Sequence, residues 1–200
     1  MQIPIEQLTK RPITFTFTDE DFARVDFKAR EIHKNVATSH GRSFNKVYES
    51  TLLGEMAEIA LIRLGARPNP YNRVGFDHTD RKTWAWDVEF DGHRIEVKCQ
   101  AHYNLDKWYR LYDKQYNKFH RLMKHSIRPT RLIVGYNMKD HLPTRNDRNV
   151  RISWMINQDF SQFMDDHARG RHIRSQFEKG PCKEKYWVVR RNVQMPKGGV

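Results

Sequence analysis

Two acidic residues and a lysine are spaced so that they could bind a divalent cation and act on a phosphate. Eight residues separate Asp87 from Glu96, and Lys98 follows Glu96 by two positions. Between the acids, the dipeptide Asp91-Gly92 favours a two-residue type I′ hairpin turn. This register places Asp87 directly opposite Glu96, at the short separation of cross-strand neighbours.

The alternating side chains of this hairpin separate a polar face from an apolar face. Lys98 and Gln100 share the polar face with Glu96, because they follow it at intervals of two residues. The residues on the opposite side are expected to form the core face. They are Trp84, Trp86, Val88, Phe90, Ile95, Val97 and Cys99. A hairpin with so apolar a face is expected to lie centrally in the sheet.

Adjacent carboxylates repel each other unless positive charge lies between them. Mg²⁺, with Mn²⁺ as a substitute, accepts hard oxygen ligands. We therefore expect Asp87 and Glu96 to bind such an ion. Lys98 would contact a substrate phosphate, orient the attacking water or stabilise developing negative charge. The alternative is a solvated hairpin face whose charges form surface ion pairs.

The chain as a whole is strongly basic. Its 200 residues include 36 Lys and Arg against 24 Asp and Glu, which gives a formal net charge of +12. Such an excess favours nucleic acid as a partner, because basic side chains neutralise phosphates and release counterions. The sequence shows no membrane span and no secretory signal, and it has few cysteines. These features predict a cytoplasmic protein without a membrane partner.

The flanking sequence predicts the elements that position the hairpin. Thr18 and Asp21 form a capping box at the start of a helix that ends near His40-Gly41, and Gly65 would end a second helix. The order of elements predicts one α/β (α+β) domain over residues 1–200, with a mixed central sheet flanked by helices. The expected helices cover about 18–40, 43–64, 106–125 and a segment after an Asn157 cap, and the other strands cover 12–18, 131–137, 150–156 and 185–193.

The hairpin residues also resemble a known signature. Asp87, eight intervening residues and then Glu96-Val97-Lys98 resemble the motif of the PD-(D/E)xK nuclease superfamily. Gln100 is similar to the last residue of the extended Glu-x-Lys-x-Gln form. The proline that often precedes the first acid is absent, since residue 86 is a tryptophan.

This resemblance covers about residues 43–156, which would form the catalytic core. It implies a restriction-endonuclease-like fold, in which a helix precedes three strands, a second helix and a further strand. It also implies Mg²⁺-dependent hydrolysis of phosphodiester bonds, with one or two Mg²⁺ ions held by Asp87, Glu96 and a further acid and with the Val97 carbonyl contributing.

Many members of the superfamily carry a glutamate on the helix before the hairpin. The segment Gly54-Glu55-Met56-Ala57 looks like the Gly-Glu-x-Ala pattern of such helices, so Glu55 is the expected third acidic ligand and catalytic residue. Glu58, one turn further on, is the substitute, and Glu49 is a third candidate. The alternative for all three acids is exposure on a solvated helix face.

Residues 107–121 interleave basic and aromatic side chains directly after the hairpin. Basic groups can neutralise phosphates, and aromatic rings can stack on unpaired bases, although a core helix with outward lysines fits the same pattern. In the loop over 66–82, Asp77 and Asp80 are alternatives to Asp87 as the first acid. The expected nucleic-acid contacts are Gln100, Lys107, Arg110, Lys114 and Lys118.

Together these observations predict a Mg²⁺-dependent endonuclease that acts on DNA, of a kind suited to a phage or mobile element. A non-catalytic DNA-binding module on the same fold and an RNA nuclease are the alternatives. The sequence leaves open whether two chains join as a homodimer to cut both strands.

Overall fold

The computed structural model describes residues 4–8, 10–40, 43–71, 82, 85–101, 108–177 and 184–190. It shows a mixed α/β architecture with a six-stranded sheet in the order β1-β7-β6-β4-β3-β2 and a three-stranded sheet in the order β5-β9-β8. The helices are α1 (Ile5–Leu8), α2 (Asp19–His40), α3 (Phe44–Arg63), α4 (Asp113–Met123) and α5 (Phe160–Ala168). The strands are β1 (Ile13–Thr16), β2 (Arg67–Pro68), β3 (Val88–Phe90), β4 (His93–Gln100), β5 (Trp108–Tyr112), β6 (Arg131–Asn137), β7 (Asn149–Asp159), β8 (Ile173–Phe177) and β9 (Glu184–Arg190).

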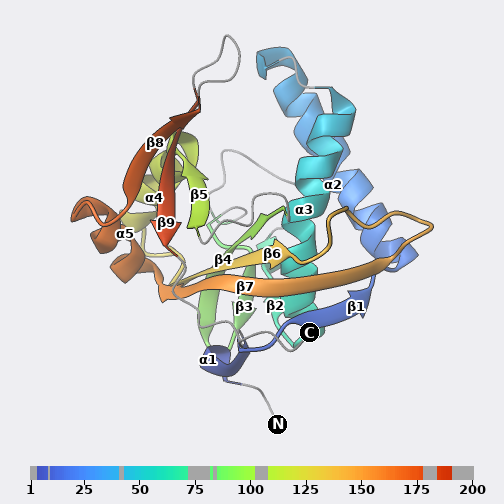
Figure 1. Cartoon of the computed structure of the whole chain (residues 1–200), viewed down its shortest axis with the longest axis horizontal. Helices are drawn as coiled ribbons and strands as arrows, with labels where there is room; N and C mark the ends of the chain where they lie inside the picture. Colours follow the sequence, from blue (N-terminus) through green and yellow to red (C-terminus); the bar gives the residue numbers. More distant parts are fainter. Residues whose placement is uncertain are drawn as a thin grey trace.

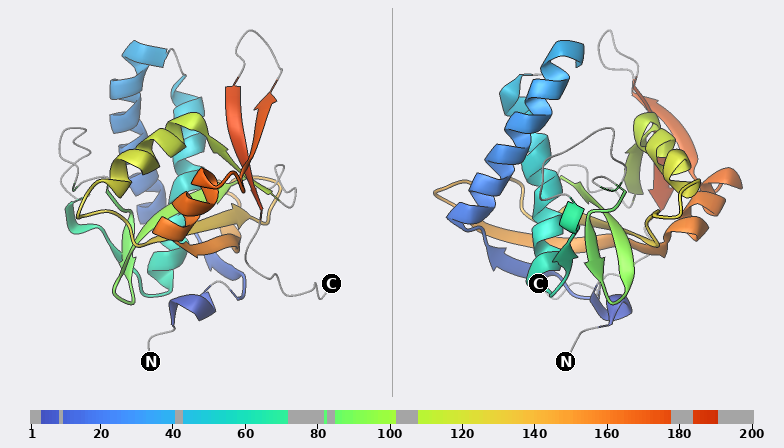
Figure 2. Two further views of the ribbon diagram at one scale, coloured as in Figure 1. Left: turned by 90° about the vertical axis from the view of Figure 1, so that its left-hand side faces the viewer. Right: turned by 180° about the vertical axis from the view of Figure 1, so that it is seen from behind.

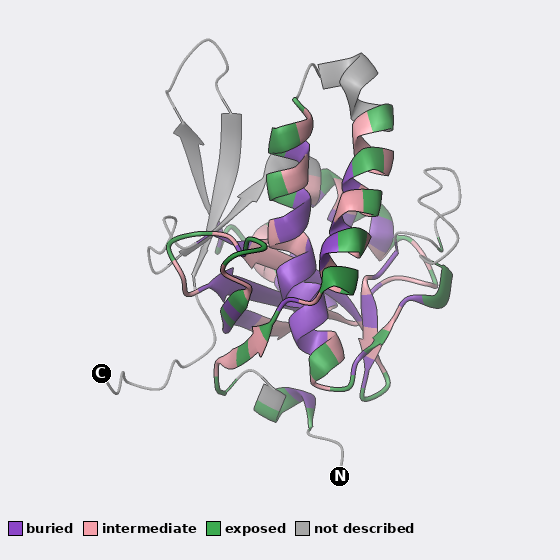
Figure 3. Ribbon diagram, turned by 90° about the vertical axis from the view of Figure 1, so that its right-hand side faces the viewer, coloured by how far each residue is buried: buried purple, intermediate pink, exposed green. Residues whose placement is uncertain are grey.

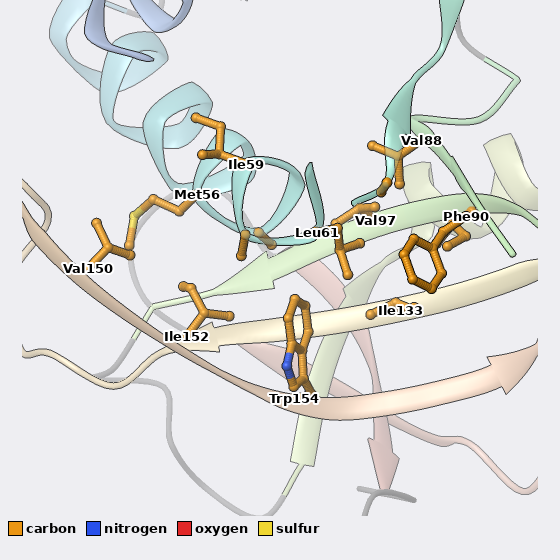
Figure 4. Packing of buried hydrophobic residues seen from close by; sticks show 14 of the residues in the cluster. Met56, Ile59, Leu61, Val88, Phe90, Val97, Ile133, Val150, Ile152 and Trp154 are labelled. Carbon is orange, nitrogen blue, oxygen red and sulfur yellow. The ribbon is translucent and has the colours of Figure 1, made fainter. Parts of the chain in front are cut away.

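Helices cover both faces of the six-stranded sheet (Figures 1 and 2). The pair α2 and α3 packs on one face, where Met56 and Leu61 meet Val97, Ile133 and other strand residues (Figure 4). On the opposite face, α4 and α5 enclose a second core with β6 and β7. The strand β6 is buried on both faces, which explains its nearly continuous apolar sequence.

The helix α3 is the central helix of the molecule. Its C-terminal half is almost wholly buried, whereas α2 keeps an exposed outer face (Figure 3). Two expected helix signals are confirmed. Thr18 and Asp21 exchange the two hydrogen bonds of a capping box, and Gly65 adopts a φ of +104° just after α3.

The predicted hairpin is confirmed at its turn. Asp91 and Gly92 have φ values of 50° and 76°, as a type I′ turn requires, and Val88 pairs with Ile95 in the expected register. The strand β4 then runs parallel to β6, whereas every other described strand pair is antiparallel. A parallel pair needs a crossover connection, and that connection contains β5 and α4.

Three details of the predicted fold are wrong. The segment expected as one helix over 106–125 begins as β5, because Trp108–Tyr112 pair with β9. The helix α5 is capped by Asp159 instead of Asn157, since β7 continues to Asp159 in its pairing with β6. Trp86 packs in the core beneath α4, away from Val88, because β3 begins only at Val88. Trp84 lies outside the described residues.

No helix in the described part of the chain combines the length and the apolar character needed to cross a bilayer.

Candidate active site

Glu96 is a charged residue at the centre of the molecule. It lies on β4 between β3 and β6, and its side chain has no exposed surface. Its Oε1 accepts hydrogen bonds from Nζ of Lys98 at 2.5 Å and from Nζ of Lys118 at 2.6 Å. Among the described residues, no hydrogen-bond donor reaches its buried Oε2. A fully buried carboxylate with two cationic partners is a costly feature to retain for stability alone.

Lys98 connects the two acids of the predicted motif. Besides its bond to Glu96, its Nζ donates to the carbonyl of Val97 at 2.8 Å and lies 3.9 Å from Oδ2 of Asp87. The alternation of β4 places Lys98 and Glu96 on the same face, so their proximity follows directly from the strand. We call Asp87, Glu96, Lys98 and Lys118 the hairpin cluster.

Asp87 reaches this cluster in a different way from the predicted cross-strand pairing. It stands just before β3, where its N–H donates to the carbonyl of Ile95, so it is not part of the β3–β4 ladder with Glu96. Its Oδ2 accepts the N–H of Val97 at 2.7 Å. The side chain is thereby fixed beside β4 although the strand pairing has ended.

The charges around Asp87 keep it ionised. Burial alone would raise the pKa of Asp87, but the ammonium groups of Lys98, Lys118 and Lys28, together with the N–H of Val97, hold the pKa below its ordinary value. The carboxylate is therefore negatively charged at neutral pH and available as a ligand or as a partner for a cation.

The two helix acids form a second cluster with bases from α2. Glu55 and Glu58 are both buried on α3. Arg24 Nε lies 2.6 Å from Oε2 of Glu55, and its Nη2 lies 3.1 Å from Oε2 of Glu58. Lys28 Nζ donates to Oε1 of Glu55 and lies 3.5 Å from Oε1 of Glu58. We call Arg24, Lys28, Glu55 and Glu58 the helix cluster.

The helix cluster and the hairpin cluster influence each other electrostatically. Burial raises the pKa of Glu58 to about 8; Lys28 and Arg24 oppose this shift, whereas Glu55 and Asp87 add to it. Burial would lower the pKa of Lys28, but the carboxylates of Glu58, Glu55 and Asp87 raise it above its ordinary value. The carboxylate of Asp87 thus acts on the ionisation of Glu58. Glu49 is exposed on the same helix and belongs to neither cluster.

A hollow of about 190 Å³ opens beside the helix cluster. A side-chain Cβ at Gly54 would meet no atom within 4 Å, so the absence of a side chain there helps keep this space open. The hollow is lined by Lys28, Ile32, Ser50, Thr51, Gly54, Glu55 and Glu58.

The remaining predicted site residues are distributed along the following elements. Gln100 lies at the end of β4 with a buried side chain. Arg110 belongs to β5 and Lys114 to the first turn of α4. Lys107, Asp77 and Asp80 lie outside the described residues. Lys118, predicted as a contact for nucleic acid, is placed by α4 directly against Glu96.

Sequence reasoning missed the contribution of α2. The signal that could have revealed it is the spacing of Arg24 and Lys28, which are four residues apart and adjacent to the apolar stripe of Val25 and Ala29. That spacing puts two bases at the border of the buried face, but their partners become visible only once α2 packs on α3.

The chemistry of the donors fits a hard divalent cation. The unsatisfied Oε2 of Glu96, the ionised carboxylate of Asp87 and the Val97 carbonyl are oxygen donors of the kind Mg²⁺ prefers. Within the described ranges, no group of three or more His, Cys, Asp and Glu side chains is arranged to hold a metal ion. Mg²⁺ commonly binds through one or two carboxylates and completes its shell with water and substrate phosphate, so a two-acid site suits it.

Comparisons with protein-family models, with curated proteins and with solved structures found no match to this chain.

Proposed function

We propose that this protein is a Mg²⁺-dependent endonuclease of the PD-(D/E)xK type that hydrolyses phosphodiester bonds in DNA. The observation that carries the proposal is the position of Lys98, whose Nζ lies 2.5 Å from Glu96 Oε1 and 3.9 Å from Asp87 Oδ2. The hairpin therefore brings Lys98 close to both acids of the motif, of which Glu96 is fully buried.

The order of elements supports the finer assignment. The helix α3 precedes the β3–β4 hairpin, and α4 lies in the crossover from β4 to the parallel strand β6. This is the order that a restriction-endonuclease-like core would have around its acids. The net charge of +12 supports a polyanionic substrate.

In this proposal Asp87, Glu96 and the Val97 carbonyl hold the ion. Bound Mg²⁺ would neutralise charge on the scissile phosphate and promote formation of the attacking hydroxide. Lys98 contributes a fixed positive charge, because its bonds to Glu96 and to the Val97 carbonyl orient its ammonium group before substrate arrives. Lys118 adds a second ammonium group on the same carboxylate.

The test is cleavage of supercoiled plasmid, single-stranded DNA and RNA of matched sequence by the purified protein with Mg²⁺, Mn²⁺ or EDTA. We expect nicking or linearisation of plasmid with either metal and none with EDTA. Lys98→Ala should lower the cleavage rate by at least about 100-fold, the scale on which one transition-state charge contact contributes. Lys139→Ala is the matched control, since Lys139 pairs with Asp147 on the β6–β7 connection.

Metal binding can be followed separately. Mg²⁺ alone should raise the melting temperature of the wild type by stabilising the native state, and Glu96→Gln should remove this shift. Glu89→Gln is the control on the same hairpin, because Glu89 lies 3.8 Å from the exposed Arg67 and belongs to neither cluster. DNA binding without cleavage in any metal would refute the enzyme and support a binding module, whereas cleavage of RNA alone would reassign the substrate.

A further inference from the structure

The helix cluster already contains a cation at the place where a second metal ion would be sought. The ammonium group of Lys28 contacts one oxygen of Glu55 and lies 3.5 Å from one oxygen of Glu58. Arg24 takes the other oxygen of each glutamate. Two buried glutamates thus contact two bases from a helix that lies outside the predicted catalytic core.

The two bases occupy different positions in this cluster. Arg24 approaches Oε2 of both glutamates, whereas Lys28 is shared between the two Oε1 atoms and also lines the hollow beside them. The Asp87 carboxylate also contributes to the raised pKa of Lys28. Lys28 is therefore the base that is shared between the Oε1 atoms of the two helix acids.

A lysine ammonium is a compact point charge, and it can take the place of a metal ion among carboxylate oxygens. We infer that Lys28 is a tethered cation that fills the position between Glu55 and Glu58. The wild-type chain therefore excludes an ion there and binds a single divalent ion at Asp87 and at Oε2 of Glu96, an oxygen that no donor among the described residues reaches. The count of one ion rests on the proposed function, but the exclusion by Lys28 does not. In this reading α2 is part of the active site, and Lys28 is a positioning residue that sets the metal stoichiometry.

The inference is tested by counting Mn²⁺ ions bound to the purified full chain without nucleic acid, using electron paramagnetic resonance and titration calorimetry. We expect one ion per chain in the wild type and two in Lys28→Met, because removal of the ammonium leaves its place between the two acids. Lys28→Arg should stay at one ion, since it restores a cation. The second ion of Lys28→Met should be lost again when Glu58→Gln is added.

Arg24→Met is the matched control. It removes the same charge from the same helix and the same acids but leaves Lys28 between the Oε1 atoms, so it should stay at one ion. Two ions in the wild type, a folded Lys28→Met that binds no more ions than the wild type, or an additional ion in Arg24→Met would each overturn the inference. If Lys28→Met does not fold, Lys28→Gln serves in its place, and the wild-type count still decides against the inference if it is two.

Adding Glu96→Gln separates this inference from the proposed function. If Lys28→Met with Glu96→Gln retains one Mn²⁺ while Glu96→Gln alone has none, both sites behave as described. If the wild type binds no ion but Lys28→Met gains one, the metal site at Asp87 and Glu96 fails and the role of Lys28 stands.

Discussion

The carboxylate of Asp87 accepts the backbone N–H of Val97, with 2.7 Å between Oδ2 and N. This bond fixes Asp87 beside β4, although Asp87 lies outside the β3–β4 ladder. The same side chain therefore has a structural role and a proposed catalytic role. The two can be separated by substitution, because an asparagine carbonyl can accept the same N–H without carrying charge.

We therefore predict that Asp87→Asn abolishes cleavage with little loss of stability. Asp87→Ala should abolish cleavage and also lower the free energy of unfolding by about 1–3 kcal/mol, since the buried N–H of Val97 loses its acceptor. Chemical denaturation and plasmid cleavage measured on both variants check this. Normal cleavage by Asp87→Asn would remove Asp87 from the site.

Lys118 should affect turnover more than binding of DNA. Its Nζ lies 2.6 Å from Oε1 of Glu96, inside the hairpin cluster, so its positive charge lies at the proposed active site. We expect Lys118→Ala to lower kcat by about 10-fold or more. The slope of binding affinity against salt should stay nearly constant, whereas loss of a duplex phosphate contact would change it by about 0.9. A lower affinity with a changed slope and an unaltered kcat would instead make Lys118 a contact for substrate.

A buried histidine should make the protein less stable in mild acid. Burial, and then the neighbouring His167, lower the pKa of His172 to about 4, and Tyr116 Oη is hydrogen-bonded to its Nδ1. Between pH 6.5 and pH 4 the unfolded chain takes up a proton on this ring that the folded chain does not. The free energy of unfolding should therefore fall as the pH decreases through this range, by at most about 3 kcal/mol.

The measurement is urea denaturation at several pH values for the wild type and for His172→Gln, which cannot titrate there. The difference between the two curves should be flat above pH 6.5 and should change steadily below it. A constant difference from pH 7 to pH 4 would show that the ring is protonated in the folded state as readily as in the unfolded chain.

Two glycines provide a matched test of packing. A Cβ at Gly135 on β6 would lie 3.0 Å from Cγ2 of Ile152 and 3.2 Å from Cζ3 of Trp154, so Gly135→Ala should destabilise the fold by about 1–3 kcal/mol. Gly54 has open space around it on α3, and Gly54→Ala should stabilise by about 0.5–1 kcal/mol through its helix propensity. Thermal unfolding of both variants gives the two signs. A Gly135→Ala variant as stable as the wild type would contradict the close packing at Gly135, and a destabilised Gly54→Ala would contradict the open space at Gly54.

The parts of the fold that could be predicted from the sequence are those set by local chemistry. The capping box of Thr18 and Asp21, the left-handed Gly65 and the Asp91-Gly92 turn each depend on neighbouring residues only. The hairpin register followed from the turn, and it placed Glu96 and Lys98 on one face of β4.

The wrong or missing parts depend on partners distant in the sequence. Residues 108–112 have aromatic and basic side chains that suit a helix, yet they form a strand because β9 pairs with them. Lys118 could not be assigned to Glu96 until the crossover placed α4 over β4. Lys28 likewise acquires its partners from α3, and no pattern within α2 specifies which acids these are.

The pairing of β1 with β7 has a consequence for the order in which the protein is made. Ile13 pairs with Ile152, and Phe15 pairs with Val150, so β1 pairs with a strand that leaves the ribosome long after it. During synthesis the backbone N–H and C=O groups of β1 bond to water until β7 has been translated, which begins more than 130 residues after β1 ends. The edge of the six-stranded sheet that β1 covers in Figure 1 is therefore closed late. A chain shortened at its N-terminus would keep that edge of β7 exposed and prone to pair with other chains.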